Sequence, residues 1–109
     1  MNVQRYAIYF ADLNPTVGSE ICKTRPVVVV SQNAMNKYLK TVVACPLTST
    51  LHPTWRSRLQ ISCAGREAEI AVDQIRTISK SRLRQKIDRL SKPDAARLRQ
   101  IITEMYGEE

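Results

Sequence analysis

The sequence predicts a mainly β protein with helices (α+β): a small, strongly bent sheet or barrel with one short inserted helix and a C-terminal helix packed on it. Strand-type segments fill most of the chain, a capped helical pattern follows, and no repeat or linker divides them. With 109 residues, of which 43% are hydrophobic and 25% charged, we expect residues 1–109 to form a single domain.

The first two strands are predicted near the N-terminus. Residues 5–13 are rich in aromatic residues and place Tyr6, Ile8 and Phe10 on one face before an Asn-Pro turn signal. Residues 27–30 are four consecutive valines, a continuous apolar run that suits a strand buried on both faces. Further strands are predicted at residues 41–47, 58–63 and 69–78, the last range holding one or two.

Helical spacing occurs in two places. Met35, Tyr38 and Leu39 follow an i, i+3, i+4 pattern and predict a short helix between two strands. A terminal helix is predicted to begin at the capping residue Ser91, with a proline and an acid just after it, and to end at Gly107. Its apolar face comprises Ala95, Leu98, Ile101, Ile102 and Met105.

The segment before this helix is ambiguous. Leu83, Ile87 and Leu90 lie at i, i+4 and i+7, which favours an amphipathic helix locally. The competing interpretation is a short helical turn followed by a strand.

Charge points to a polyanionic partner. Seventeen Lys and Arg against ten Asp and Glu leave a net charge of +7, which suits a nucleic acid or an acidic protein. The basic residues 80–99 are expected to be a solvated face, and alternatively to meet an acidic protein segment. No apolar run is long enough to cross a membrane and no signal peptide is evident, so we expect a cytoplasmic protein.

Several classes of chemistry are excluded by composition. Three scattered cysteines and one histidine do not supply a zinc site, so no metal and no cofactor are expected. The glycine-rich motifs of nucleotide-binding enzymes are absent. A ribonuclease with paired histidines is excluded, because His52 is the only one, and we expect it to be an exposed loop residue.

Three segments together resemble the MazF/PemK family of toxin endoribonucleases. The first is the loop Asp12-Leu13-Asn14-Pro15-x-x-Gly18-Ser19-Glu20, and the second is Arg25-Pro26 followed by the valine strand. The third is Pro46-Leu47-Thr48-Ser49, with Asp73-Gln74-Ile75-Arg76-Thr77-Ile78 downstream. Their order and spacing match the family pattern over nearly the whole chain.

The resemblance implies a compact SH3-like, CcdB-like barrel, a homodimer, and a short strand over residues 84–90. It also implies the toxin of a type II toxin–antitoxin system, neutralised by a small acidic antitoxin. The implied reaction is metal-independent, sequence-specific cleavage of single-stranded RNA (mRNA) that leaves a 2′,3′-cyclic phosphate and a 5′-OH.

The family pattern maps the two catalytic positions onto Arg25 and Thr48. A guanidinium matches the charge that develops on the phosphate oxygens, and a threonine hydroxyl can hold the phosphate in line. Because arginine is protonated at neutral pH it is a poor general base, and we interpret Arg25 as a transition-state stabiliser that can also donate a proton to the leaving oxygen. Some relatives have an arginine where this chain has Ala71, which leaves Asp73 only as an auxiliary base.

The expected RNA-binding residues lie in the loops around this pair: Ser19, Glu20, Ser49, Trp55, Arg56, Asp73 and Gln74. Trp55 can stack an unpaired base while Arg56 and Arg58 contact phosphate, or it can cover the core. Ser19 and Glu20 can be ordinary loop residues, and Asp73 and Gln74 can serve backbone groups at a strand end.

Two other functions compete with RNA cleavage. One is a non-enzymatic toxin of the same fold that acts on DNA gyrase. The other is a basic barrel that binds RNA or an acidic peptide without catalysis.

Overall fold

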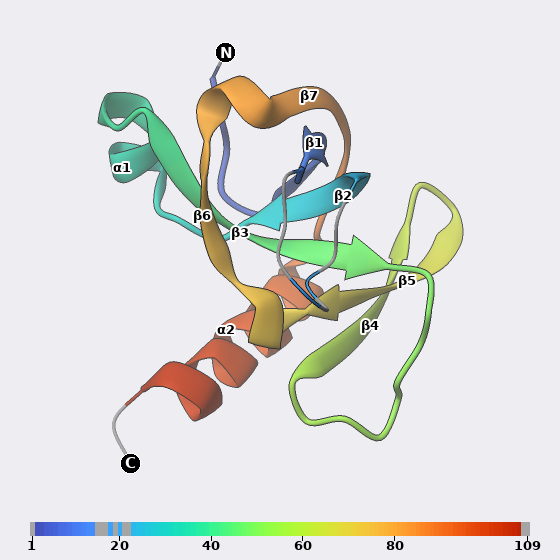
Figure 1. The fold of residues 1–109 in the computed structure, drawn as a ribbon. Helices are drawn as coiled ribbons and strands as arrows, with labels where there is room; N and C mark the ends of the chain where they lie inside the picture. The colour runs from blue at the N-terminus through green and yellow to red at the C-terminus, as the bar shows by residue number, and fades with distance from the viewer. Residues whose placement is uncertain (1, 15–17, 19, 21–22, 108–109) are drawn as a thin grey trace.

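The computed structural model describes residues 2–14, 18, 20 and 23–107, and in these residues one curled antiparallel sheet packs against a C-terminal helix (Figure 1). The strands are β1 (Ala7–Asp12), β2 (Thr24–Val29), β3 (Thr41–Thr48), β4 (Arg58–Cys63), β5 (Arg66–Ala71), β6 (Arg76–Ser79) and β7 (Leu83–Arg89). The helices are α1 (Asn33–Tyr38), α2 (Lys92–Tyr106) and the short 3₁₀ turns η1 (Val72–Gln74) and η2 (Lys80–Arg82).

Strand β3 is the centre of the sheet. The strand order is β4-β5-β3-β2-β1-β7, and β6 also pairs with β3. β3 pairs with β6 through residues 41–44 and with β5 through residues 47–48. The partner changes at Cys45 and Pro46, which pair with neither strand, and the sheet bends there toward a barrel (Figure 1).

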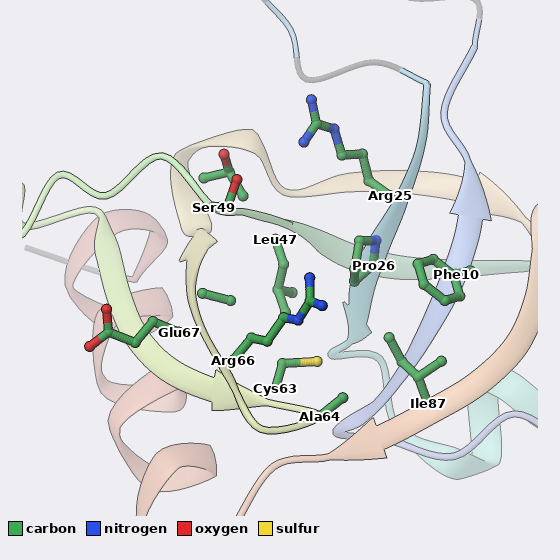
Figure 2. A pocket seen from close by; sticks show the side chains of 12 residues that line it. Phe10, Arg25, Pro26, Leu47, Ser49, Cys63, Ala64, Arg66, Glu67 and Ile87 are labelled. Carbon is green, nitrogen blue, oxygen red and sulfur yellow. The ribbon is translucent and has the colours of Figure 1, made fainter.

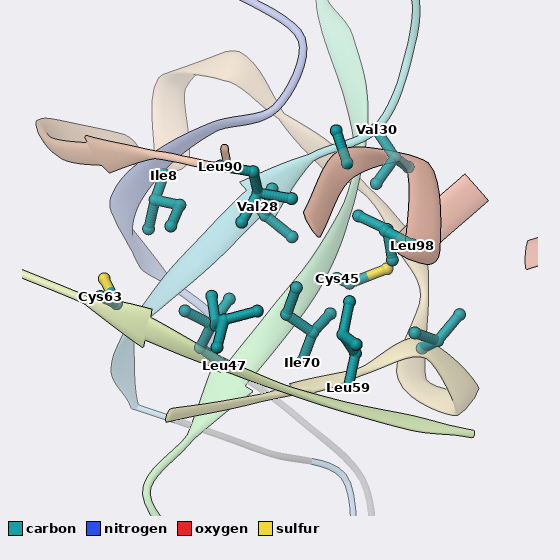
Figure 3. Packing of buried hydrophobic residues seen from close by; sticks show 13 residues of the cluster. Ile8, Val28, Val30, Cys45, Leu47, Leu59, Cys63, Ile70, Leu90 and Leu98 are labelled. Carbon is teal, nitrogen blue, oxygen red and sulfur yellow. The ribbon is translucent and has the colours of Figure 1, made fainter. Parts of the chain in front are cut away.

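The sheet is buried on both faces at β2, as the valine run predicts. Val28 belongs to a core cluster that also contains Leu98 of α2, whereas Val27 and Val29 belong to a second cluster with Leu13 and Ile78. Figure 3 shows the first cluster, with Leu98 directed at Cys45 and Val30. Alternate side chains of one strand therefore serve two cores.

Helix α2 begins and ends where its sequence signals predict. The Ser91 hydroxyl accepts a hydrogen bond from the Asp94 N–H at 3.2 Å, and the Gly107 N–H donates to the Thr103 carbonyl at 2.8 Å. No helix in the described part of the chain has the length and apolar character needed to span a bilayer.

The local preference for a helix over residues 83–90 is wrong. Residues 83–89 form β7, which pairs with β1 and agrees with the strand that the family pattern implies. Leu83 is buried, Ile87 is half-buried, and irregularities in the β1–β7 register accompany this pairing. Pairing with β1 outweighed the local spacing, which fits either structure at positions four apart.

The inserted helix forms, but its apolar residues are not the buried ones. Met35, Tyr38 and Leu39 are exposed, whereas Asn36 is buried and hydrogen-bonded to the Ser31 carbonyl and hydroxyl. A buried amide is stable here because its donor and acceptor groups are both satisfied.

Removal of the α2 anchor should destabilise the fold. Leu98→Ala is expected to lower the free energy of unfolding by about 2–5 kcal/mol, because it leaves a cavity where the side chain is fully buried. Met105→Ala on the same helix is the control and should cost less than about 1 kcal/mol, since that side chain is partly exposed. Urea denaturation measures both, and equal losses would contradict the packing described.

Candidate active site

A concavity of about 390 Å³ lies between β2, the end of β3 and the β4–β5 hairpin (Figure 2). Its floor is mainly apolar and its rim carries charged and hydroxyl side chains. The lining residues are Phe10, Arg25, Pro26, Leu47, Thr48, Ser49, Cys63, Ala64, Arg66, Glu67, Ala68 and Ile87. We call this concavity the Arg25–Thr48 pocket.

Antiparallel pairing brings the two predicted catalytic residues together. The β2–β3 ladder ends with Val27 paired to Pro46, and Arg25 and Thr48 each lie two residues beyond this pair, at the same end of the two strands. Both side chains are half-buried and line the pocket, together with Ser49. A guanidinium and a hydroxyl at one concavity form a plausible cradle for a phosphate group.

The Thr48 hydroxyl is oriented by its own loop. Its oxygen accepts a hydrogen bond from the Thr50 N–H at 3.1 Å. Because this bond uses a lone pair, the hydroxyl proton can be donated to a ligand in the pocket.

Two charged residues of the pocket were missed in the sequence. Arg66 and Glu67 follow a tight turn in which Ala64 and Gly65 both have positive φ, and the Ala64 N–H donates to the Asp88 carboxylate at 2.8 Å. Figure 2 shows Arg66 extending into the pocket from the side opposite Arg25. In the sequence, the Ala-Gly pair predicts the turn that precedes these residues. Only the fold shows that the β4–β5 hairpin reaches the end of β3.

The other predicted RNA-binding residues lie elsewhere. Trp55, Arg56, Asp73 and Gln74 do not line the Arg25–Thr48 pocket. Glu20 is exposed, and Ser19 lies outside the described residues. The structure therefore brings together the proposed catalytic pair and Ser49 in one pocket, whose lining does not include Trp55, Arg56, Asp73 or Gln74.

Arg58, Glu69 and Asp73 form a second group, which we call the charge cluster. Arg58 donates to Glu69 Oε2 from Nη1 at 2.7 Å and to Asp73 Oδ1 from Nε at 2.8 Å. Glu69 is fully buried and also accepts the His52 backbone N–H at 2.5 Å and the Gln60 amide at 2.6 Å. A buried carboxylate with this many donors is well compensated for its lost hydration.

These contacts set the charge states of the cluster. Burial by itself raises the pKa of Glu69, but hydrogen bonds from the His52 backbone N–H and from Arg58 outweigh it, so that this pKa lies below its usual range. For Asp73 the effect of burial is likewise exceeded by Arg58, and the pKa is again lowered. Both carboxylates are therefore ionised at neutral pH.

The expectations for Arg58 and His52 need correction. Arg58 is not an exposed phosphate contact, because it is buried against two carboxylates. His52 is not a free loop residue, because its Nδ1 lies 3.2 Å from Glu69 Oε2 and its ring stacks on Trp55. The sequence around His52 and Arg58 gives no sign of Glu69 and Asp73, the distant carboxylates that contact them.

The described thiols behave as core residues. Cys45 and Cys63 are free and buried, and burial, with a smaller contribution from Asp73, raises the pKa of Cys45 to about 12. Within the described residues, no three His, Cys, Asp or Glu side chains are grouped closely enough to hold a metal ion.

Sequence comparisons identify the family of the chain. A family model for the PemK-like, MazF-like toxin of type II toxin–antitoxin systems matches residues 4–106. The chain is 36% identical over 95 residues to the endoribonuclease EndoA of Bacillus subtilis (strain 168), an alignment that covers 83% of this chain and 82% of that protein. It is 34% identical over 97 residues to the endoribonuclease MazF of Staphylococcus saprophyticus, covering 82% and 78%.

Solved structures share the architecture. MazF from Deinococcus radiodurans superposes with a TM-score of 0.87 at 20% identity, over 99% of both chains. An endoribonuclease from a mycobacterial species, solved with its cognate antitoxin, superposes with a TM-score of 0.82 at 22% identity, over 98% of this chain and 97% of that one. The predicted mainly β barrel with a C-terminal helix is confirmed.

The charge cluster should make stability depend on acid. Because the pKa values of Glu69 and Asp73 are lowered in the folded state, their contribution is complete above the ordinary carboxyl range. It is lost as the pH falls from about 5 through the lowered folded pKa values. Guanidinium denaturation between pH 7 and pH 3 should show this decrease, and Asp73→Asn should flatten it.

Glu104→Gln is the matched control, since Glu104 is exposed on α2 and outside the cluster. Its acid profile should follow that of the unmodified protein. An Asp73→Asn profile as steep as the control would contradict the assignment of this acid sensitivity to the cluster.

Proposed function

The chain belongs to the PemK-like, MazF-like toxin family of type II toxin–antitoxin systems, as its motifs indicate, and from this premise we propose that it is an endoribonuclease. The proposed substrate is single-stranded RNA, in the cell mRNA, cut at specific sequences without a metal ion or other cofactor. The observation that carries the proposal is the meeting of Arg25 and Thr48 in one pocket. Relatives that cover most of the chain are named endoribonucleases, which supports the same activity.

In the proposed reaction the ribose 2′-oxygen attacks the adjacent phosphorus. A new P–O2′ bond forms as the P–O5′ bond breaks. The proton of the 2′-OH passes to solvent, and the leaving 5′-oxygen takes a proton from Arg25, which regains one from solvent. The products are a 2′,3′-cyclic phosphate and a free 5′-OH.

Arg25 stabilises the charge that develops on the non-bridging oxygens and supplies the proton to the leaving oxygen. Thr48 donates its hydroxyl proton to a phosphate oxygen and keeps the scissile bond in line. Arg66 enters the pocket from the other side and supplies a second cation for the RNA backbone.

Asp73 is left out of this mechanism. It does not line the Arg25–Thr48 pocket, and its carboxylate is engaged by Arg58. A carboxylate whose pKa is lowered by a buried arginine is a poor proton acceptor.

We propose two protein partners in the cytoplasm: a second copy of this chain and a small acidic antitoxin. A mycobacterial structural relative is solved with its cognate antitoxin, which supports the latter. Arg89, Lys92 and Arg99 surround one surface concavity beside Tyr6, and none has a carboxylate within salt-bridge distance in the described residues. Such a surface suits an acidic partner.

Sedimentation equilibrium tests the homodimer against the monomer mass of 12.4 kDa.

Substitution of the catalytic pair should abolish cleavage and leave the fold intact. With a long RNA in excess EDTA, the unmodified protein should give discrete cuts with cyclic-phosphate ends. Arg25→Ala and Thr48→Ala should each lower the cleavage rate by at least about 100-fold, the loss typical of a donor to a developing oxyanion. End mapping of the products and circular dichroism of each variant make the measurement.

Conservative variants separate chemistry from folding. Thr48→Ser keeps the hydroxyl and should retain most of the activity, whereas Arg25→Lys keeps the charge but loses the two parallel donors. Cleavage by Arg25→Ala at the unmodified rate would show the site to be wrong. RNA left intact by well-folded protein would favour a binding module, and DNA breaks in the presence of gyrase would favour a gyrase-directed toxin.

A further inference from the structure

Trp55 is an exposed aromatic residue that is packed from one side. It lies in the loop between β3 and β4, and 48% of its surface is exposed. The His52 ring stacks on it with centroids 3.9 Å apart and an angle of 24° between the planes. The guanidinium carbon of Arg58 lies 4.8 Å from the centre of the indole.

His52 and Arg58 must contact the same face of the indole. Their Nδ1 and Nη1 atoms are 3.2 Å apart. A ring stacked 3.9 Å above the indole and a guanidinium 4.8 Å below it would be separated by considerably more than this. The opposite face therefore has no aromatic or cationic partner in the described part of the chain.

The supported face is held rigidly by the charge cluster. Glu69 accepts the His52 backbone N–H, lies 3.2 Å from His52 Nδ1 and pairs with Arg58. The loop backbone adds two bonds, from the Trp55 N–H to the His52 carbonyl at 3.0 Å and from the Arg58 N–H to the Trp55 carbonyl at 3.3 Å. An aromatic side chain held in this way loses little conformational entropy when a ligand stacks on it.

The same carboxylate links this loop to the Arg25–Thr48 pocket. In the β3–β5 ladder Glu69 is the pairing partner of Thr48, and the loop that carries Trp55 begins directly after Thr48. Trp55 is therefore connected to Thr48 through Glu69, which pairs with Thr48 and contacts the His52 and Arg58 side chains beside the indole. Exposed Arg56, next to Trp55, suits the phosphate of the same nucleotide.

We propose that the outer face of Trp55 is a stacking site for one unpaired nucleobase that flanks the cleaved bond, with His52, Arg58 and Glu69 as its positioning residues. The identity of the ligand, a base of single-stranded RNA, rests on the proposed function. A planar base matches a flat, exposed indole, whereas an acidic peptide would use only the neighbouring positive charge. Stacking on this face tolerates any base. The site therefore adds to the affinity for RNA and helps to position the strand, but it does not select a base.

Trp55 is the only tryptophan in the chain, so its fluorescence reports this site alone. The ligand is a 2′-O-methylated oligoribonucleotide, which lacks the attacking hydroxyl and is not cleaved. Its binding should quench the emission of Trp55, whereas inorganic polyphosphate of equal charge should bind without comparable quenching. Equal quenching by polyphosphate would overturn the proposal, because charge alone would then explain the signal.

Affinity is measured with a labelled form of the same oligonucleotide by fluorescence anisotropy. Trp55→Ala should raise the Kd roughly 5- to 150-fold, the range that alanine substitution gives for one stacked base. Trp55→Phe should restore most of the affinity. Tyr38→Ala is the control, since Tyr38 is also exposed beside a lysine but lies on α1. Its Kd should be unchanged.

The positioning role is tested without disturbing the buried pair. His52→Ala removes the ring beneath the indole but leaves Arg58 and Glu69 in place, so the fold is preserved. It should reduce the quenching by the oligonucleotide and leave polyphosphate affinity unchanged, and His52→Phe should restore the quenching. Unchanged oligonucleotide quenching in His52→Ala would contradict the positioning role.

Failure of the stacking site is distinguishable from failure of the proposed function. The stacking site would be overturned if the oligonucleotide did not quench the unmodified protein and Trp55→Ala bound it with an unchanged Kd. The proposed endoribonuclease would still stand if Trp55→Ala cleaved RNA. Quenching by oligonucleotide without any RNA cleavage would preserve the site and overturn the enzyme.

Discussion

One strand with three partners is the constraint on which the rest of the structure depends. β3 pairs with β2 along one edge and, along the other, first with β6 and then with β5. Two successive partners on one edge cannot continue a single flat ladder, so the sheet bends between them. The bend brings the end of β3 against the β4–β5 hairpin and creates the pocket in which Arg25 meets Thr48.

The proposed catalytic pair and the loop between β3 and β4 are supported in different ways. Backbone register places Arg25 and Thr48, so their position depends on the ladders that also form the core. Buried charge holds the loop after Thr48, because Glu69 accepts one of the loop's own N–H groups and so provides a polar anchor.

Much of the fold, and the family, could be predicted from sequence, because those signals are local or ordered along the chain. The valine strand and the capped terminal helix are examples, and the order of three motifs indicated the family and thereby Arg25 and Thr48. The rest depends on tertiary partners. Pairing with β1 decided the structure of residues 83–89, and the burial of Arg58 depends on carboxylates more than ten residues away.

Buried charge also has an evolutionary consequence for the loop between β3 and β4. Loss of one partner of a buried ion pair costs about 3–5 kcal/mol, a large share of the roughly 5–15 kcal/mol that stabilises a domain. Arg58 and Glu69 can therefore be replaced only together, whereas exposed loop positions such as Thr54 and Arg56 carry no such penalty. Mutational drift in this segment is thus directed to its exposed positions, so that the surface of the loop can diversify while the buried pair beneath it is kept.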